Sequence, residues 1–405
     1  MYTYKINIDI DEYETFAKRQ KQVTLLQSSN WAKVKDSWGS DRLAFYDNNT
    51  IVGTALLLTQ PLPLGMTMLY IPRGPIIDYS NQSLIQFVLD TLKKIAKEKR
   101  AILVKFDPFI PLKHYQINEP NPDLAHGLNI VETLTKLGCD WTGRTVDLSE
   151  NIQPRFQAVI KAENFSEAIL SKSTRQIIRT ARNKGVQIQF GHLDLLDDFT
   201  SLMKKTETRK SISLRNKTYY QKLLESYPDN SYITLATIDL EQRYKNLEQS
   251  LTITRQSMVN LENSQTKSKD SKLKQLQDES NRIIEEQQFL KKHMKSGPTV
   301  IPLAGTLTIE YAHTSENLYA GMDDEFRRYQ AAVITWFETA KHAFEHGVEW
   351  QNLGGIENNL DGGLYHFKSK FNPFIEEYIG EFNLPISPLY HLFNLVYKIR
   401  KKIKK

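Results

Sequence analysis

The sequence predicts the α/β class, of the mixed α+β kind, with two units of similar build and a helical hairpin inserted in the second. Three observations carry this prediction. Strand-like segments such as residues 42–63 are followed by helical ones. Pairs of segments distant in the chain have similar sequence patterns, and one segment without glycine has a seven-residue apolar repeat. At 405 residues the chain is long enough for two or three domains, each with its own core.

The composition is that of a soluble globular protein, with 40% hydrophobic and 25% charged residues. No run of eighteen apolar residues is present to span a bilayer, and the N-terminus lacks the basic and apolar regions of an export signal. We therefore expect a cytoplasmic protein. The single cysteine, Cys139, excludes an internal disulfide and a multi-cysteine metal site, and the nine histidines have no ligand-like spacing, so we expect no metal.

Two echoes suggest that the α/β units repeat. Residues 132–141 and 338–350 each begin a helix with Glu-Thr and end with tryptophan entering a strand. Residues 96–108 and 343–355 each predict a helix end, a strand and a loop. In the first of these loops, Asp107 follows the apolar strand AILVKF and precedes a proline, so it is either a turn former or a candidate site residue.

The net charge of +6 is concentrated in patches. Residues 171–184 contain five basic side chains and no acid, and the helical spacing of four of them places a row of cations on one face: Lys172, Arg175, Arg179 and Arg182. This row is suited to phosphates, as in transfer RNA or anionic lipid, or is simply a solvated helix face. Residues 397–405 add six cations with apolar residues between them, which suits an anionic membrane surface or aids solubility.

Residues 240–294 contain no glycine, proline or tryptophan, and leucines recur there at a seven-residue step. One apolar seam runs through Leu240, Leu247 and Leu261, and a second runs through Leu276, Ile283 and Leu290 after a polar break. This pattern predicts an antiparallel helical hairpin with arms of about 33 Å. Because residues 231–239 and 299–311 both resemble strands, we expect them to pair across the hairpin.

Residues 362–371, GGLYHFKSKF, combine two glycines with aromatic rings and cations. The glycines allow close approach of the backbone to a ligand. On an extended segment, Phe367 and Lys368 point to opposite sides, which would present a ring and an ammonium to different surroundings. The structural alternative is a glycine turn that leads into an edge strand.

Several motifs, in this order along the chain, resemble the FemABX peptidyltransferases and, within them, the streptococcal MurM-type enzymes. They are QSSxWxxVK (27–35), YIPRGP (70–75), FDP (106–108), SKSTRQIIRTARNKG (171–185), Arg215 with Tyr219-Tyr220, LYAG (318–321) and GGLYHFKSKF (362–371). The resemblance implies two tandem acetyltransferase-like (GNAT) domains. The first would span 1–150 and be completed by 380–405, the second 151–239 and 297–379, with the hairpin at 240–296.

The resemblance implies transfer of serine or alanine from aminoacyl-tRNA to the stem-peptide lysine amine of lipid II, which starts a peptidoglycan cross-bridge. The implied partners are aminoacyl-tRNA, lipid II and the anionic inner face of the cell membrane, with no cofactor. Three alternatives stay open: addition of the second bridge residue, as in MurN, a non-catalytic scaffold binding tRNA or membrane, and a simple acetyltransferase. Against the last, the chain lacks the Q/R-x-x-G-x-G/A loop that cradles coenzyme A.

The resemblance also assigns roles to residues. Asp107 would handle the attacking amine, and Lys368 would act at the acceptor end of aminoacyl-tRNA together with Phe367 and Tyr319. The remaining residues would bind the diphosphate and muropeptide of lipid II: Lys35, Arg215, Trp38, Tyr219 and Trp31. From the residues alone, core packing explains Trp31 better than a site role does, and Trp38 is the better site candidate. Arg73 either binds an anion or supports a loop between two prolines.

Overall fold

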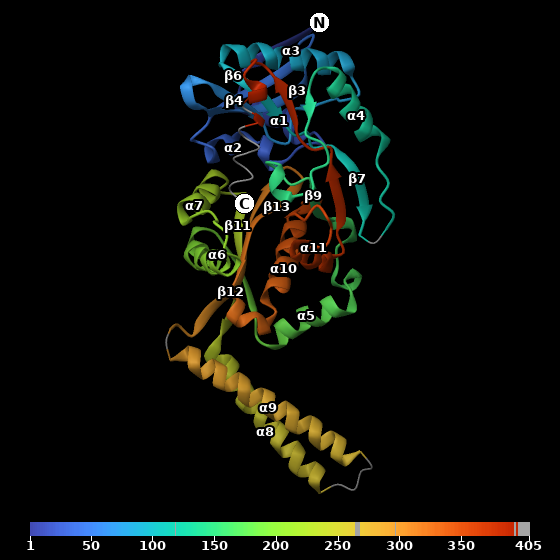
Figure 1. Cartoon of the computed structure of the whole chain (residues 1–405). Helices are drawn as coiled ribbons and strands as arrows, with labels where there is room; N and C mark the ends of the chain where they lie inside the picture. The colour runs from blue at the N-terminus through green and yellow to red at the C-terminus, as the bar shows by residue number, and fades with distance from the viewer. Residues whose placement is uncertain (118, 264–267, 296, 393, 396–405) are drawn as a thin grey trace.

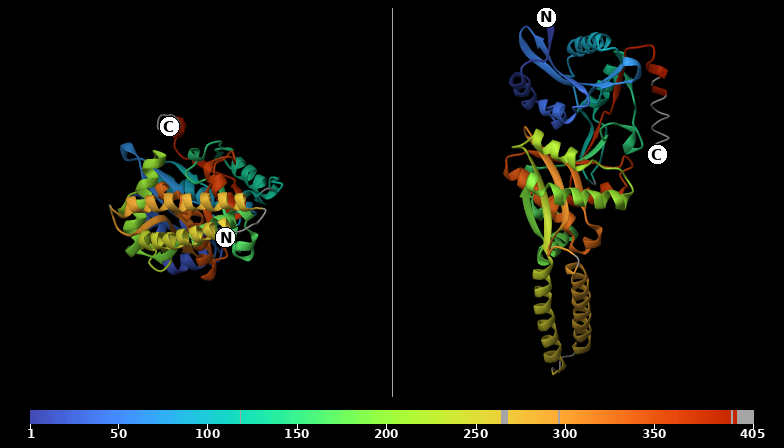
Figure 2. Two further views of the ribbon diagram at one scale, coloured as in Figure 1. Left: turned by 90° about the horizontal axis from the view of Figure 1, so that it is seen from below. Right: turned by 90° about the vertical axis from the view of Figure 1, so that its left-hand side faces the viewer.

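The computed structural model describes residues 1–117, 119–263, 268–295, 297–392 and 394–395. Two lobes, each built on a mixed sheet, lie end to end, and a helical arm projects from the second (Figures 1 and 2). The first sheet contains, in spatial order, β1 (Tyr2–Ile6), β2 (Gly39–Asp47), β3 (Thr50–Pro61), β4 (Thr67–Ile71), β6 (Ala101–Phe106), β16 (Phe382–Pro385) and β8 (Asp140–Trp141), with β5 (Ile76–Ile77) beside β3.

The second sheet is ordered β10 (Gln187–Gly191), β11 (Ser231–Asp239), β12 (Val300–Tyr311), β13 (Thr314–Met322), β14 (Trp350–Gly355), β9 (Phe156–Lys161), β15 (Phe374–Tyr378) and β7 (Pro111–Gln116). The lobes exchange strands. The N-terminal β7 pairs with β15 of the second sheet, while the C-terminal β16 pairs with β6 and β8 of the first. The division into domains at residue 150 therefore remains a proposal, although β16 does return to the first sheet as expected from the resemblance.

Helices cover the sheets. In the first lobe they are α1 (Ile10–Lys18), α2 (Ser29–Val34), α3 (Gln82–Glu98) and α4 (Ala125–Lys136). In the second lobe they are α5 (Lys172–Asn183), α6 (Leu196–Lys210), α7 (Lys217–Ser226), α10 (Ala331–Glu345) and α11 (Gly363–Lys368). Between the lobes, the Ser28 hydroxyl at the start of α2 lies 2.6 Å from the Tyr227 hydroxyl at the end of α7.

Each sheet contains a parallel strand pair connected through a helix. In the first lobe α3 leads into β6, which pairs with β4 up to Ile71 and Phe106. In the second lobe α10 leads into β14, which pairs with β13 only as far as Glu316 and Asn352. The echo between residues 96–108 and 343–355 therefore marks equivalent elements, and the prediction of two similar α/β units is confirmed. The similarity between residues 132–141 and 338–350 relates β8 to β14. These two strands are not equivalent, because β8 pairs with the antiparallel β16 whereas β14 pairs with the parallel β13.

The hairpin consists of α8 (Leu240–Glu262) and α9 (Lys269–Met294), and it projects away from both lobes (Figure 2). Strands β11 and β12 pair directly at its base, where Asp239 is opposite Val300, so the hairpin interrupts the second lobe as predicted. Four of the predicted seam residues are buried, namely Leu240, Leu247, Ile283 and Leu290. Part of the predicted polar turn, residues 264–267, and the basic residues 397–405 lie outside the described residues.

None of the helices in the described ranges is both long and apolar enough to cross a membrane.

Candidate functional site

Asp107 lies immediately after β6 and is only 1% exposed. Its carboxylate accepts a hydrogen bond from the Arg73 amide at 2.6 Å and another from the Tyr70 hydroxyl at 3.1 Å. Burial raises the pKa of Asp107 to about 7, with the Arg73 charge opposing this shift and Glu381 adding to it. A carboxyl group with such a pKa can accept and release a proton near neutral pH.

Arg73 supports the loop around Asp107. It has a positive φ of 51° and is buried, and its guanidinium donates to the Pro154 carbonyl at 2.7 Å and packs 4.4 Å from the Tyr378 ring. Arg73 was expected either to bind an anion or to support a loop, and these contacts are those of a residue that supports the loop. Tyr70 is a further residue of the YIPRGP motif at this site, to which the sequence analysis assigns no role, and it donates to the same Asp107 carboxylate as Arg73.

Lys35 and Arg215 come together at the surface between the lobes. Lys35 ends α2, Arg215 precedes α7, and Tyr219 lies between them: the Lys35 amine is 5.9 Å from its ring centre and the Arg215 guanidinium is 4.9 Å from it. Burial and then the Arg215 charge lower the pKa of Lys35. Within the described part of the chain neither cation has a carboxylate partner, and neighbouring Asp36 pairs with Lys222 instead. Two cations arranged in this way can bind a phosphate or diphosphate.

The aromatic residues divide between packing and the site. Trp31 is 7% exposed and belongs to the core, although the Lys35 amine lies 5.2 Å from its ring centre. Trp38 is half-buried and contacts Tyr70 edge-on at 6.5 Å, which links the Lys35 region to Asp107. Tyr319 in β13 lies 6.1 Å from Tyr219, so the structure groups it with the two cations rather than with Phe367.

The GGLYHFKSKF segment is not extended, and the sequence-based expectation of a strand there was wrong. Residues Gly363–Lys368 form α11, because the carboxylate of Glu357 accepts hydrogen bonds from the Leu364 and Tyr365 amides, each at 2.9 Å. These two bonds satisfy donors at the start of the helix. A Cβ atom on Gly362 would lie 2.1 Å from the Glu357 carboxyl carbon, so only glycine leaves room for this contact.

Lys368 points inward from α11 and is 5% exposed. Its amine donates to the Gly355 carbonyl at the end of β14 at 2.6 Å and lies 5.8 Å from the Trp336 ring centre. Burial lowers the pKa of Lys368 to about 7, with Glu357 opposing the shift and Lys210 adding to it. Phe367 packs edge-on against the same Trp336 at 5.3 Å. No local sequence pattern points to Glu357 or Trp336, because each acts through contacts with residues outside its own segment.

The four predicted cations of α5 do lie on a helix, but they are not equivalent. Arg182 forms ion pairs with Glu167 and Glu338 at 2.8 and 2.9 Å, so it is neutralised. The Arg179 guanidinium donates to the side chain of Gln176. For Lys172 and Arg175 no acidic partner is found among the described residues, and these two stay available to an anion.

Two α/β units of this topology, each with a parallel strand pair connected through a helix, define a tandem GNAT fold. A tandem GNAT protein from the clavulanic acid biosynthesis pathway shares the fold, with a TM-score of 0.50 at 7% identity over 95% of this chain and 99% of that one. A model of the FemAB family matches residues 8–398, and the chain belongs to this family.

Similar proteins support this membership over the full length. The lipid II:glycine glycyltransferases of Staphylococcus saprophyticus and Staphylococcus haemolyticus are 29% and 27% identical to this chain, and the alignments cover 99% of it and 98% and 99% of those proteins. The crystal structure of FemX superimposes with a TM-score of 0.75 at 26% identity, covering 96% of this chain and 99% of that one.

Proposed function

We propose that this enzyme transfers an amino acid from aminoacyl-tRNA to the lysine side-chain amine in the stem peptide of lipid II. The observation that carries the proposal is the arrangement of Lys35 and Arg215, two cations without an acidic partner in the described residues, near Trp38, Tyr70 and the buried acid Asp107. The diphosphate of the precursor binds the cations, and the stem peptide extends towards Asp107. The names of the staphylococcal relatives support lipid II as the acceptor.

The residues divide the chemistry of transfer. Asp107 removes a proton from the lysine ammonium, and the free amine attacks the ester carbonyl of the aminoacyl-tRNA. A C–N bond forms and the ester bond to the ribose breaks. Of the two protons that the nitrogen loses, one passes to the ribose oxygen and the other leaves through Asp107 to solvent. Lys368, in its charged form, stabilises the negative charge that develops on the carbonyl oxygen and on the leaving ribose oxygen.

For the donor, serine or alanine is proposed from the resemblance to MurM-type enzymes, with this enzyme adding the first residue of the bridge. Glycine is the second candidate, because the relatives are named for glycine. Addition of a second residue to a precursor that already has one is the competing assignment.

We further propose peripheral binding at the cytoplasmic face of the membrane, where lipid II is available. Three exposed leucines near the C-terminus, Leu389, Leu392 and Leu395, support this proposal, with exposures of 47, 62 and 57%. In the sequence they precede the basic residues 397–405. Apolar side chains combined with basic ones suit an anionic bilayer surface.

The test is to incubate the purified protein with lipid II and separately charged seryl-, alanyl- and glycyl-tRNA, and to measure the mass of the stem peptide. We expect the mass to increase by one residue, and the tRNA that gives the fastest reaction identifies the donor. Precursor that already carries one residue is the control for second-residue addition. No product with any tRNA and either precursor would contradict the transferase assignment and leave the scaffold alternative.

A further inference from the structure

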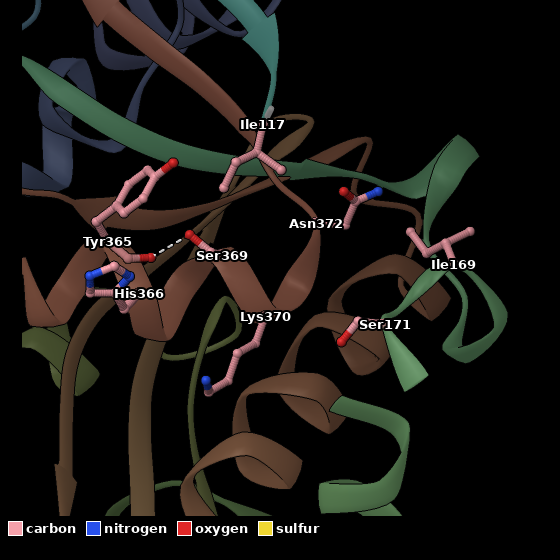
Figure 3. A pocket seen from close by; sticks show the side chains of 8 residues that line it. All are labelled: Ile117, Ile169, Ser171, Tyr365, His366, Ser369, Lys370 and Asn372. Carbon is pink, nitrogen blue, oxygen red and sulfur yellow. Dashed lines mark hydrogen bonds between the residues drawn. The ribbon is translucent and has the colours of Figure 1, made fainter. Parts of the chain in front are cut away.

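A cavity of about 390 Å³ lies between α11 and the start of α5. Figure 3 shows the side chains that line it. Five come from α11 and the turn after it, namely Tyr365, His366, Ser369, Lys370 and Asn372, and the others are Ile117, Ile169 and Ser171. One wall is therefore polar and aromatic, and isoleucines contribute an apolar part. The volume and this mixture suit one nucleotide unit, with a base to stack and a phosphate to neutralise.

The cavity and the Lys368 amine lie on different sides of the same short helix. Lys368 points inward to the Gly355 carbonyl, whereas Tyr365, His366 and Ser369 face the cavity. An α-helix is about 10 Å across, and stacked nucleotides along one strand are about 3.4 Å apart. A single strand whose last nucleotide lies at Lys368 would therefore reach the cavity with a nucleotide about three positions back.

The charges at the cavity favour an anion. The Lys370 amine has no hydrogen bond or ion pair with any residue that the structure describes, and neither Lys172 nor Arg175 on the adjoining helix has an acidic partner there. Among the lining side chains, His366 is paired with the Asp361 carboxylate at 3.1 Å. The cavity thus offers a free ammonium beside two aromatic rings, a combination that binds single-stranded nucleic acid.

We infer that this cavity binds a nucleotide in the single-stranded acceptor end of the tRNA, a few positions before the aminoacylated nucleotide, with Lys370 on its phosphate and Tyr365 or His366 on its base. The inference rests on the proposed function for the identity of the RNA. It adds a second RNA contact to Lys368 and identifies α5 as the helix along which the strand continues.

The first experiment measures binding without transfer. A fluorescent, uncharged RNA hairpin with a single-stranded 3′ end is titrated with the protein at several salt concentrations, and the affinity is read by anisotropy. We expect Lys370→Ala to weaken binding about tenfold and to reduce the slope of log affinity against log salt by about 0.7, as for the loss of one phosphate contact on a single strand. The matched control is Lys274→Ala, which removes an exposed lysine from α9 of the hairpin and should change neither quantity.

A second variant fills the cavity instead of removing its charge. Ile169 is 41% exposed and lines the cavity, so Ile169→Trp should block RNA binding while the melting temperature stays unchanged. With charged tRNA, both variants should raise KM for the tRNA and leave kcat unchanged, because Lys368 is intact. If Lys370→Ala and Ile169→Trp bind the RNA hairpin as tightly and with the same salt slope as Lys274→Ala, the inference is overturned.

Two further arms separate the RNA from other anions and from the proposed function. Vesicles containing phosphatidylglycerol should bind parent and Lys370→Ala equally. Loss of vesicle binding with unchanged RNA binding would overturn the inference in favour of a lipid headgroup. If the parent transfers nothing but its RNA binding depends on Lys370, the cavity assignment stands and the proposed function fails. If transfer occurs and RNA binding is independent of Lys370, the proposed function stands and the cavity assignment fails.

Discussion

At the end of the parallel pair β4 and β6 lies a buried acid, and at the end of the parallel pair β13 and β14 lies a buried amine. Asp107 is the residue that directly follows its strand, and it is held by the donors Arg73 and Tyr70. Lys368 comes from a separate helix and is held by the Gly355 carbonyl of its strand. Burial moves both pKa values to about 7 from opposite directions. In the proposed function, the two lobes use the same topological position for opposite tasks: Asp107 accepts a proton and Lys368 stabilises negative charge.

The largest effect is expected at the amine. Lys368→Ala should lower kcat about a thousandfold at saturating lipid II, because removing a group that stabilises an oxyanion typically costs a factor of a hundred to a thousand. Single-turnover transfer from charged tRNA measures this directly. Full activity in Lys368→Ala would show that the buried amine of the second lobe takes no part in the transfer reaction.

The acid should matter somewhat less. Asp107→Asn should lower kcat/KM about a hundredfold, since loss of a general base usually costs at least that factor. The parent should lose activity as the pH falls below about 7, where Asp107 becomes protonated, and this decline should be absent in Asp107→Asn. A pH profile of kcat/KM with both proteins is the measurement, and an unchanged decline in the variant would assign it to another group.

The cation pair should affect binding rather than chemistry. Lys35→Ala and Arg215→Ala should each raise KM for lipid II about tenfold, as expected when a charge-assisted hydrogen bond to phosphate is lost, with little change in kcat. The control is Lys217→Ala, at the first residue of α7, because Lys217 is already paired with Asp197. A drop in kcat at saturating lipid II would mean that the pair acts in the reaction itself.

Glu357 should have a smaller effect, through the position of Lys368. Glu357→Gln keeps one acceptor for the α11 amides but removes the charge, so we expect kcat to fall about fivefold, corresponding to a helix-cap contribution of about 1 kcal/mol. Because the carboxylate opposes the lowering of the Lys368 pKa, that pKa should fall further in the variant. A pH profile that does not move would show that Glu357 acts only on stability.

The smallest effects are on stability, and their signs differ between the lobes. The pKa of Asp107 in the folded protein is above its unfolded value of 3.8. Burial of this carboxyl group therefore destabilises the folded protein increasingly as the pH rises from about 4 to 7. Over that range Asp107→Asn should become more stable relative to the parent protein. The pKa of Lys368 in the folded protein is below its unfolded value of 10.5. Burial of this amine therefore destabilises the folded protein by the full amount below about pH 7, and the destabilisation disappears towards pH 10. Lys368→Met should therefore be most stabilising in acid.

Melting temperatures of the parent and both variants from pH 5 to 9 test these signs. We expect differences of a few degrees, with the advantage of Asp107→Asn growing and that of Lys368→Met shrinking as the pH rises. Parallel curves would contradict the opposite ionisation of the two sites.

Local sequence was enough for some of these features. Asp107 was placed at a strand end because an apolar run precedes it and a proline follows it, and the hairpin was found because its leucines repeat every seven residues. The helix α11 was missed because a carboxylate outside the motif, that of Glu357, stabilises it. The position of Tyr319 beside Tyr219 depends on how β13 faces α7, which no local pattern encodes. The same holds for the exchange of β7 and β16, whose pairing partners lie far away in sequence.

The exchange of β16 affects how the protein is made. Lys105 on β6 and its ion-pair partner Glu381, just before β16, are 276 residues apart. At 5 to 20 residues per second, roughly 14 to 55 seconds of synthesis separate them. During that time β6 pairs with β4 on one side only, and its other side is an open sheet edge, which is prone to mispairing. The first lobe to emerge from the ribosome is therefore the last to be completed, and a chain truncated before residue 382 would lose the integrity of its N-terminal half.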